Sequence, residues 1–311
     1  MPYNSLVSRT DTAALVPEEV SSAMMTNLEA RSAVLQYGQR IPIATNQTRF
    51  PVLSALPTAY FVSGDTGLKQ TTEAAWDNKY LYVEEIATIV PIPEAVLDDT
   101  SYDVWGAIQP LMEQAIVRAL DAAVIFGTNA PATWITEGNL VGGAVAAGNV
   151  VARGTNNAAA GGLHGDLSDL IATLELDGYN PNGAIGNVTL KGRLRGVRAT
   201  DGQVLSLPAD VPTPMYDLAG LWPTGTSAAE LLVGDWSKLV VGVRQDMTYK
   251  LITEGVITDN TGAIVYNLPQ QDMVALRLVF RAGYAVSNPI NYQELTEADR
   301  YPFAVLRSPA A

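Results

Sequence analysis

The chain has 311 residues and a mass of 33.1 kDa, which is enough for two domains or one elaborated domain. Hydrophobic residues make up 48% and charged residues only 16%, so the sequence predicts a sizeable core and excludes global disorder. A soluble monomer normally covers itself with more charge, and this shortage predicts that other chains cover much of the surface. The formal net charge of −13 argues against a protein that grips nucleic-acid phosphates.

Side chains that catalyse reactions or bind metals are scarce. The chain has no cysteine, which excludes disulfides, a thiolate nucleophile and cysteine-based zinc sites. One histidine cannot form a histidine metal pair, and neither a calcium loop nor a glycine-rich phosphate-binding motif occurs. We therefore expect no enzyme activity, no cofactor and no metal. The N-terminus lacks a signal-peptide pattern, and the most apolar stretch, residues 140–152, is too short to span a membrane, so we expect neither secretion nor membrane insertion.

Residues 1–44 alternate short helical patches with polar breaks, and one helix could begin at Pro17. This segment has too few apolar residues to fold on itself, so we expect an arm that lies across another part of the assembly. Residues 45–90 are predicted to form a long two-stranded hairpin that projects from the body, with strands expected over 49–62 and 80–92. Because an isolated two-stranded hairpin is marginal in water, it requires a neighbour.

The triplet Asp65-Thr66-Gly67 at the end of this hairpin matches the catalytic triplet of aspartic proteases. That chemistry requires two carboxylates that share a proton, and no second triplet occurs. Gly64 and Gly67 bracket a polar tip, which is typical of a hairpin turn. The pattern therefore favours a turn over a protease site.

The longest helical pattern extends from Asp103, a suitable cap, to Phe126, with Gly127 as its end. Pro110 lies inside it and should either kink the helix or begin a second one. Residues 138–165 are rich in Gly, Ala and Asn without periodicity, so we expect a connector, with His164 as a plain loop histidine.

A second unit is expected to begin at Asp166 with a helix that ends at Gly178, because apolar residues recur there at helical spacing. Short strands and turns follow. They are expected at Leu231–Gly234, at Leu239–Arg244, at Leu251-Ile252, at the Asp259–Gly262 turn, and at the clear alternating strand Val274–Tyr284.

Basic residues cluster once, at Lys191, Arg193, Arg195 and Arg198. The cluster lacks interleaved aromatic residues, so nucleic-acid stacking has little support. Salt bridges to a partner chain are the favoured interpretation.

The order of these elements resembles the major capsid proteins of tailed double-stranded-DNA bacteriophages, which have the Hong Kong 97 fold. Several short motifs in matching order carry the resemblance. They are Phe50-Pro51-Val52-Leu53, Ile92-Pro93-Glu94-Ala95-Val96-Leu97-Asp98-Asp99, Gly234-Asp235-Trp236-Ser237 and Val279-Phe280-Arg281-Ala282-Gly283-Tyr284. Pro93 stands where the family often has Ser, and Pro110 interrupts the long helix.

The resemblance implies an α+β fold of the Hong Kong 97 type, divided into five segments. These are an N-terminal arm (1–44), an E-loop hairpin (45–90), a P-domain with its spine helix and connector (91–165), an A-domain (166–264), and a P-domain return strand with the C-terminal segment (265–311). The E-loop residues Tyr60, Phe61, Asp65 and Lys69 are then expected at contacts between subunits.

The resemblance also implies partners and a location. The subunit is expected to assemble with itself into the pentamers and hexamers of an icosahedral shell around phage DNA, held without sequence-specific binding. A separate scaffolding protein, a portal and an optional decoration protein are the other expected partners. The place of assembly is the bacterial host cytoplasm, and the final location is the virion.

Some members of this family join an E-loop lysine covalently to an asparagine of a neighbour. Lys69 and the pair Asn288 and Asn291 are the candidates here, with Lys79 at the base of the returning strand. An amide-forming lysine must lose its proton, which requires desolvation, and Gln70-Thr71-Thr72 provides little apolar cover. The sequence therefore favours a non-covalent shell.

Two other functions stay open at this point. An encapsulin-like compartment would share the fold but package enzymes. A two-domain hydrolase built around His164 belongs to a different class and has less support, because no nucleophile motif accompanies the histidine.

Overall fold

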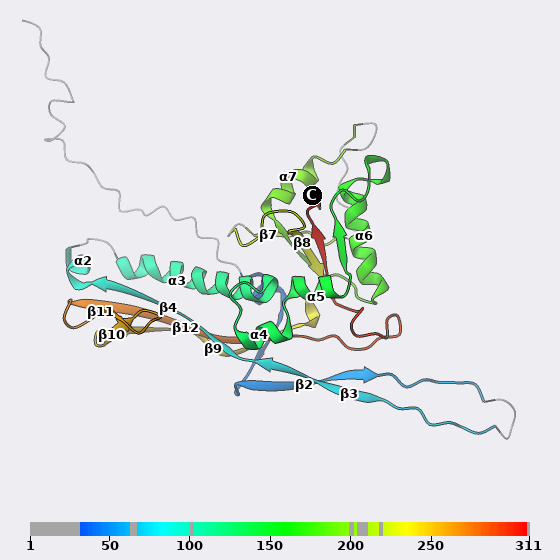
Figure 1. The fold of residues 1–311 in the computed structure, drawn as a ribbon, viewed down its shortest axis with the longest axis horizontal. Helices are drawn as coiled ribbons and strands as arrows, with labels where there is room; N and C mark the ends of the chain where they lie inside the picture. The colour runs from blue at the N-terminus through cyan, green and yellow to red at the C-terminus, as the bar shows by residue number, and fades with distance from the viewer. Residues whose placement is uncertain are drawn as a thin grey trace, which may run out of the picture.

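The computed structural model describes residues 32–62, 67–99, 103–198, 202–203, 211–217 and 220–309. Within these residues, helices and strands are mixed, and the strands form two larger sheets and two hairpins. Figure 1 shows an elongated body along the long helix, an upright unit on top of it, and a thin two-stranded projection. The predicted α+β class is confirmed.

A four-stranded sheet with the order β1-β9-β12-β4 forms the elongated body. The central strand β12 (Met273–Val286) pairs antiparallel with β9 (Leu239–Ile252) and with β4 (Glu84–Pro93). The short β1 (Gln39–Pro42) adds to β9 in parallel. The predicted strand over 274–284 and its buried apolar face with Leu278 and Phe280 are confirmed, but Ala275 and Val279 of the other face are buried too, so burial does not alternate.

The long helix covers that buried face (Figure 1). It consists of α3 (Val104–Asp121) followed without a break by a π-helical turn, η2 (Ala122–Phe126). Asp103 caps the start by accepting a hydrogen bond from the Gly106 amide at 3.0 Å. Gly127 ends it with φ +72°, a conformation that costs glycine little. The prediction that Pro110 begins a second helix is wrong, because α3 continues through Pro110.

Two short helices flank the body. The first, α1 (Ala33–Tyr37), packs against α3, and the second, α2 (Glu94–Asp99), follows β4 directly. Residues 1–31 lie outside the described residues, and so does the helix expected from Pro17.

The upright unit contains a five-stranded sheet with the order β5-β13-β8-β6-β7. The strand β13, which is the last in the sequence, lies between β5 and β8. The strands are β5 (Val150–Ala152), β6 (Gly183–Asn187), β7 (Met215–Asp217), β8 (Ala229–Gly234) and β13 (Phe303–Arg307).

Helices cover both faces of this sheet. On one face, α6 (Leu163–Leu176) and α7 (Val188–Arg195) share an apolar cluster with strand residues, and the predicted stripe of α6 is buried there. On the other face, α5 (Leu140–Ala146) joins the cluster around the long helix. One core therefore connects the two sheets.

The connector expected over 138–165 is wrong in part, because it contains α5 and β5, and α6 begins at Leu163. Asn139 caps α5 by accepting from the Gly142 amide, and Gly143 lies against the ring of Tyr301. Small residues allow close packing here, which is why hydrophobic periodicity does not reveal the helix. His164 is a buried residue of α6 rather than a loop residue. The remaining short elements are α4 (Ala132–Glu137) and the 3-10 turns η3 (Ala158–Ala160) and η4 (Trp236–Lys238).

Two further predictions about strands need correction. The strand expected over 80–92 is two strands, since β3 (Ala75–Tyr82) pairs with β2 (Gln47–Ala55) and β4 enters the four-stranded sheet. The two strands expected near 239–252 are the single strand β9. The turn at Asp259–Gly262 is confirmed, and it joins β10 (Val256–Thr258) to β11 (Ile264–Asn267).

Two strands belong to a different sheet from the other strands of the sequence segment that is expected to contain them. The segment 166–264 includes β9, which pairs with β12 in the four-stranded sheet. The segment 265–311 includes β13, which is central in the five-stranded sheet. In both cases the strand pairs with strands that lie far from it in the sequence, which the division into consecutive segments does not anticipate.

Candidate subunit interfaces

The two-stranded projection exposes large apolar side chains. Its base is the β2–β3 pair, and residues 56–62 and 67–74 continue beyond it (Figure 1). Phe61 is fully exposed, Leu68 is 89% exposed and Trp76 is 66% exposed. Exposing large apolar side chains to water is unfavourable in free energy, so this projection is suited to contact another chain.

The structure brings three of the four predicted contact residues to the outer part of this projection. Tyr60, Phe61 and Lys69 are all exposed there. The Tyr60 hydroxyl donates to the Gln70 carbonyl at 2.8 Å, which ties the outgoing segment to the returning one. Asp65 lies outside the described residues, as does the turn expected around it.

The base of the projection rests on the loop after β12. Lys79 forms an ion pair with Glu297, with 2.8 Å between Nζ and Oε1. The Tyr292 hydroxyl donates to the Pro57 carbonyl at 3.3 Å. Both Lys79 and Glu297 line a groove of about 430 Å³, and Asn288 lines it as well. These contacts fix the direction in which the projection leaves the body.

The two candidate asparagines are held by hydrogen bonds within the chain. Asn288 is buried, its amide donates to the Arg300 carbonyl at 2.7 Å, and its oxygen accepts from Tyr179. Burial raises the pKa of Tyr179 to about 12, so its hydroxyl stays a donor. The Asn291 amide donates to the Asp177 carbonyl at 2.6 Å. Sequence reasoning could not find these partners, since Tyr179 and Asp177 lie more than one hundred residues away.

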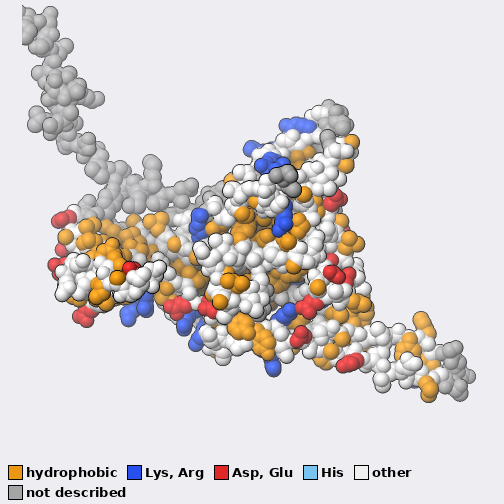
Figure 2. Space-filling model, viewed as in Figure 1, with side chains coloured by type: hydrophobic (Ala, Val, Ile, Leu, Met, Phe, Trp, Pro, Cys, Tyr) orange, Lys and Arg blue, Asp and Glu red, His pale blue; other side chains and the backbone are white. Residues whose placement is uncertain are grey.

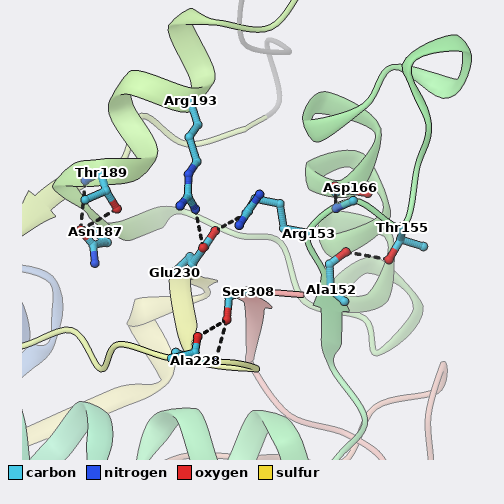
Figure 3. A network of polar contacts seen from close by, with 12 residues as sticks. Ala152, Arg153, Thr155, Asp166, Asn187, Thr189, Arg193, Ala228, Glu230 and Ser308 are labelled. Carbon is cyan, nitrogen blue, oxygen red and sulfur yellow. Dashed lines mark hydrogen bonds and ion pairs between the residues drawn. The ribbon is translucent and has the colours of Figure 1, made fainter. Parts of the chain in front are cut away.

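Ion pairs hold the outer end of the five-stranded unit. Figure 3 shows Glu230 of β8 between Arg153 and Arg193, and the Arg153 Nε lies 2.8 Å from its carboxylate. Glu230 is buried, whereas both guanidinium groups reach the surface. Arg193 belongs to the basic cluster, so one of its four members is paired within its own chain. Nearby, Asp166 accepts from the Gly154 and Asn156 amides.

Acidic and histidine side chains form no metal-binding cluster in the described residues. They contain no group of three or more His, Cys, Asp or Glu residues that could hold a metal ion. His164 lies on α6, where burial lowers its pKa. None of the helices described is long and apolar enough to span a bilayer. The surface features are those of a protein that contacts other chains.

Comparison with known proteins decides what kind of assembly this surface serves. A family model described as "Phage capsid family" matches residues 12–291. The chain belongs to the phage capsid family. This assignment confirms the resemblance found in the sequence, and it disfavours both the encapsulin-like compartment and the hydrolase.

Relatives of this capsid protein match almost end to end. The "Major capsid protein" of Staphylococcus phage 80alpha is 24% identical over 288 residues, covering 91% of this chain and 85% of that protein. A structure from Microbacterium phage Oxtober96 is 36% identical with a TM-score of 0.83, covering 98% of this chain and 100% of that chain. One from Mycobacterium phage Cain is 30% identical with a TM-score of 0.86, covering 99% and 100%. The Hong Kong 97-like fold is confirmed, and the chain is a phage capsid subunit that forms the shell.

Proposed function

We propose that this capsid subunit builds an icosahedral shell of pentamers and hexamers that encloses the double-stranded DNA of a tailed phage. Membership of the capsid family supports the shell. The observation that supports contacts between neighbours is the projection with its exposed Phe61, Leu68 and Trp76. We propose no catalytic role, since capsid subunits act by assembly rather than by chemistry.

The projection acts as the E-loop in this proposal. Tyr60, Phe61 and Lys69 lie on its outer part and would contact a neighbouring subunit, and Asp65 belongs to the same contact. The four-stranded sheet and the α3 helix form the P-domain, which includes β9. The five-stranded sheet with α6 and α7 forms the A-domain, which includes β13. Residues 1–44 would serve as the N-terminal arm, whose described end is fixed by α1 and β1.

A non-covalent shell is part of the proposal. The Lys69 side chain is exposed to water, whereas an amide-forming lysine requires burial in apolar surroundings. Asn288 and Asn291 donate their amides to backbone carbonyls of their own chain. Lys79 is the lysine that shares a groove with Asn288, and it is paired with Glu297. A covalent bond would first have to break these interactions.

The negative net charge of −13 favours a wall that does not hold the packaged DNA tightly. The other partners proposed are a separate scaffolding protein, a portal and, where the phage has one, a decoration protein. Assembly would occur in the cytoplasm of the bacterial host, and the shell would become part of the virion.

Electron microscopy of particles isolated from infected cells tests the shell directly, because we expect closed particles of uniform size rather than separate globules. Particles isolated from infected cells should contain DNA that nuclease digests only after the shell is opened. Closed particles that contain packaged enzymes and no DNA would support the compartment instead.

A further inference from the structure

The two helices on the outer face of the five-stranded sheet lie over opposite ends of it. The α6 helix packs on β13 and β5, and α7 packs on β6 and β7. In Figure 1 they stand on the two sides of the upright unit. Both bury their apolar sides in one cluster, and the residues after α7 line one groove with the start of α6, so the separate edges are the far sides of the two helices.

The α7 edge is basic. Of residues 188–198, four are basic and none is acidic. Arg193 is paired with Glu230, but Lys191, Arg195 and Arg198 are exposed. Lys191 also lies over the ring of Tyr216, with 5.5 Å from Nζ to the ring centroid. Three cationic side chains are therefore exposed along this edge, of which Arg198 also donates to the Arg195 and Val197 carbonyls.

The α6 edge is acidic. Of residues 163–177, four are acidic and none is Lys or Arg. Asp166 and Asp177 are buried and accept hydrogen bonds within the unit. Asp169 and Glu175 are exposed. Figure 2 shows the corresponding separation, with blue side chains at the upper left of this unit and red ones on its right.

Each edge also exposes one large apolar side chain beside its charges. Leu176 on α6 is 75% exposed, and Val188 on α7 is 42% exposed. Charges of opposite sign together with an apolar side chain on each surface are the features of two surfaces that fit each other.

We propose that the α7 edge of one subunit packs against the α6 edge of a second copy of this chain, repeated around a rotation axis of the shell. Contacts between two different edges of identical copies close into rings when the rotation from one copy to the next divides a full turn, as it does around a symmetry axis of a shell. The reverse arrangement, in which like edges meet, would place Arg195 and Arg198 against the same residues of the neighbour and is disfavoured by repulsion. The inference rests on the proposed shell and names the residues that orient its rings.

Disulfide trapping tests the contact, because the chain has no cysteine of its own. In this test, Arg195→Cys is combined either with Glu175→Cys or with Asp169→Cys, and the assembled particles are then oxidised. At least one pair should give a ladder of multimers on a non-reducing gel, ending at the size of a closed ring. The single variants and the pair Arg195→Cys with Glu254→Cys, whose second site is an exposed residue outside the sheet unit, should give no such ladder.

Charge reversal tests the energetics. Arg195→Glu with Arg198→Glu should lower particle yield at least about tenfold, and so should Asp169→Lys with Glu175→Lys. Combining all four changes should restore the yield to within about threefold, because the edges remain complementary. A control variant that combines the two α7 changes with Glu254→Lys, in place of the two α6 changes, should not recover the particle yield. Circular dichroism of the unassembled variants checks that they fold.

Normal particles from the α7 reversal, or particles that form without any ladder from either cysteine pair, would overturn this contact. Failure of the unmodified chain to form particles in infected cells, where the proposed scaffolding protein is present, would instead contradict the proposed shell.

Discussion

Asp121 is a buried carboxylate that fixes the chain as it enters the described fold. It accepts hydrogen bonds from the Ser32 hydroxyl at 2.6 Å and from the Ala33 amide at 2.8 Å. Asp121→Ala would leave these donors buried without that acceptor, so we expect a loss of about 2–4 kcal/mol in the free energy of unfolding. Urea denaturation of the unassembled subunit measures it. Asp98→Ala, at an exposed position of α2, should stay within about 0.5 kcal/mol, and equal effects of the two variants would contradict the assigned role.

His164 should make the subunit sensitive to mild acid. Burial lowers its pKa in the folded state below the ordinary value of 6.5, so the unfolded chain binds a proton more readily. Its contribution is therefore fully present above the unfolded pKa and is lost as pH falls through that value toward the folded one. We expect His164→Gln to lose less stability between pH 7 and pH 5 than the unmodified chain does. Parallel pH slopes of melting temperature would refute this.

Residue roles could be predicted from the sequence where their causes are local. Asp103 and Gly127 are both found at the ends of the long helix, as capping chemistry predicts. The buried positions of His164 and Asn288 could not be predicted, because their surroundings come from distant segments. The Asn288 oxygen, for example, accepts a hydrogen bond from Tyr179, which follows α6 in the sequence.

At the scale of elements, β12 determines the core of the elongated body. Phe280 is buried between this strand and the long helix. Phe280→Ala should lower stability by about 3–5 kcal/mol, since it removes a ring and leaves a cavity. Val265→Ala on the exposed strand β11 is the control and should cost less than about 1 kcal/mol. Thermal melting compares them, and an unchanged Phe280→Ala subunit would show that the strand does not carry the core.

Elements with strong periodicity could be predicted, and those that pack through small residues could not. The predicted stripes of α6 and β12 are buried as expected. That of α3 is buried only in part, since Met112 and Ile116 are buried but Ala115 and Ala119 are exposed. Helix α5 has the sequence Leu-Val-Gly-Gly-Ala-Val-Ala, which has no polar face for a pattern to detect. The division of residues 75–93 into β3 and β4 depends on which sheet each half joins, and a single strand pattern does not contain that information.

At the scale of the whole molecule, the projection should be dispensable for folding and necessary for assembly. Replacing residues 57–73 by Asn-Gly keeps β2 and β3 and removes most of the exposed apolar surface. We expect a soluble subunit with nearly unchanged melting temperature that forms no closed shells. Phe61→Ser, which keeps the projection, should lower the yield of shells less. Particles of normal size from the deletion variant would contradict the role of the projection.

Boiling assembled particles in denaturing detergent distinguishes the two kinds of shell. We expect one band near the 33.1 kDa monomer, because the candidate asparagines are held within their own chain. A ladder of multimers that disappears in Lys69→Ala would show that the shell is covalent after all. A ladder lost in Lys79→Ala would point to the groove lysine instead.

The position of β13 has a consequence for the timing of synthesis. Residues 303–307 lie between β5 and β8, and they complete the apolar clusters on both faces of their sheet. A nascent chain on the ribosome therefore lacks an inner strand of this sheet until residue 307 has been translated and released from the exit tunnel. We expect incomplete chains to stay unable to join a growing shell, so that translation errors near the end remove a subunit from assembly instead of building a defect into the particle.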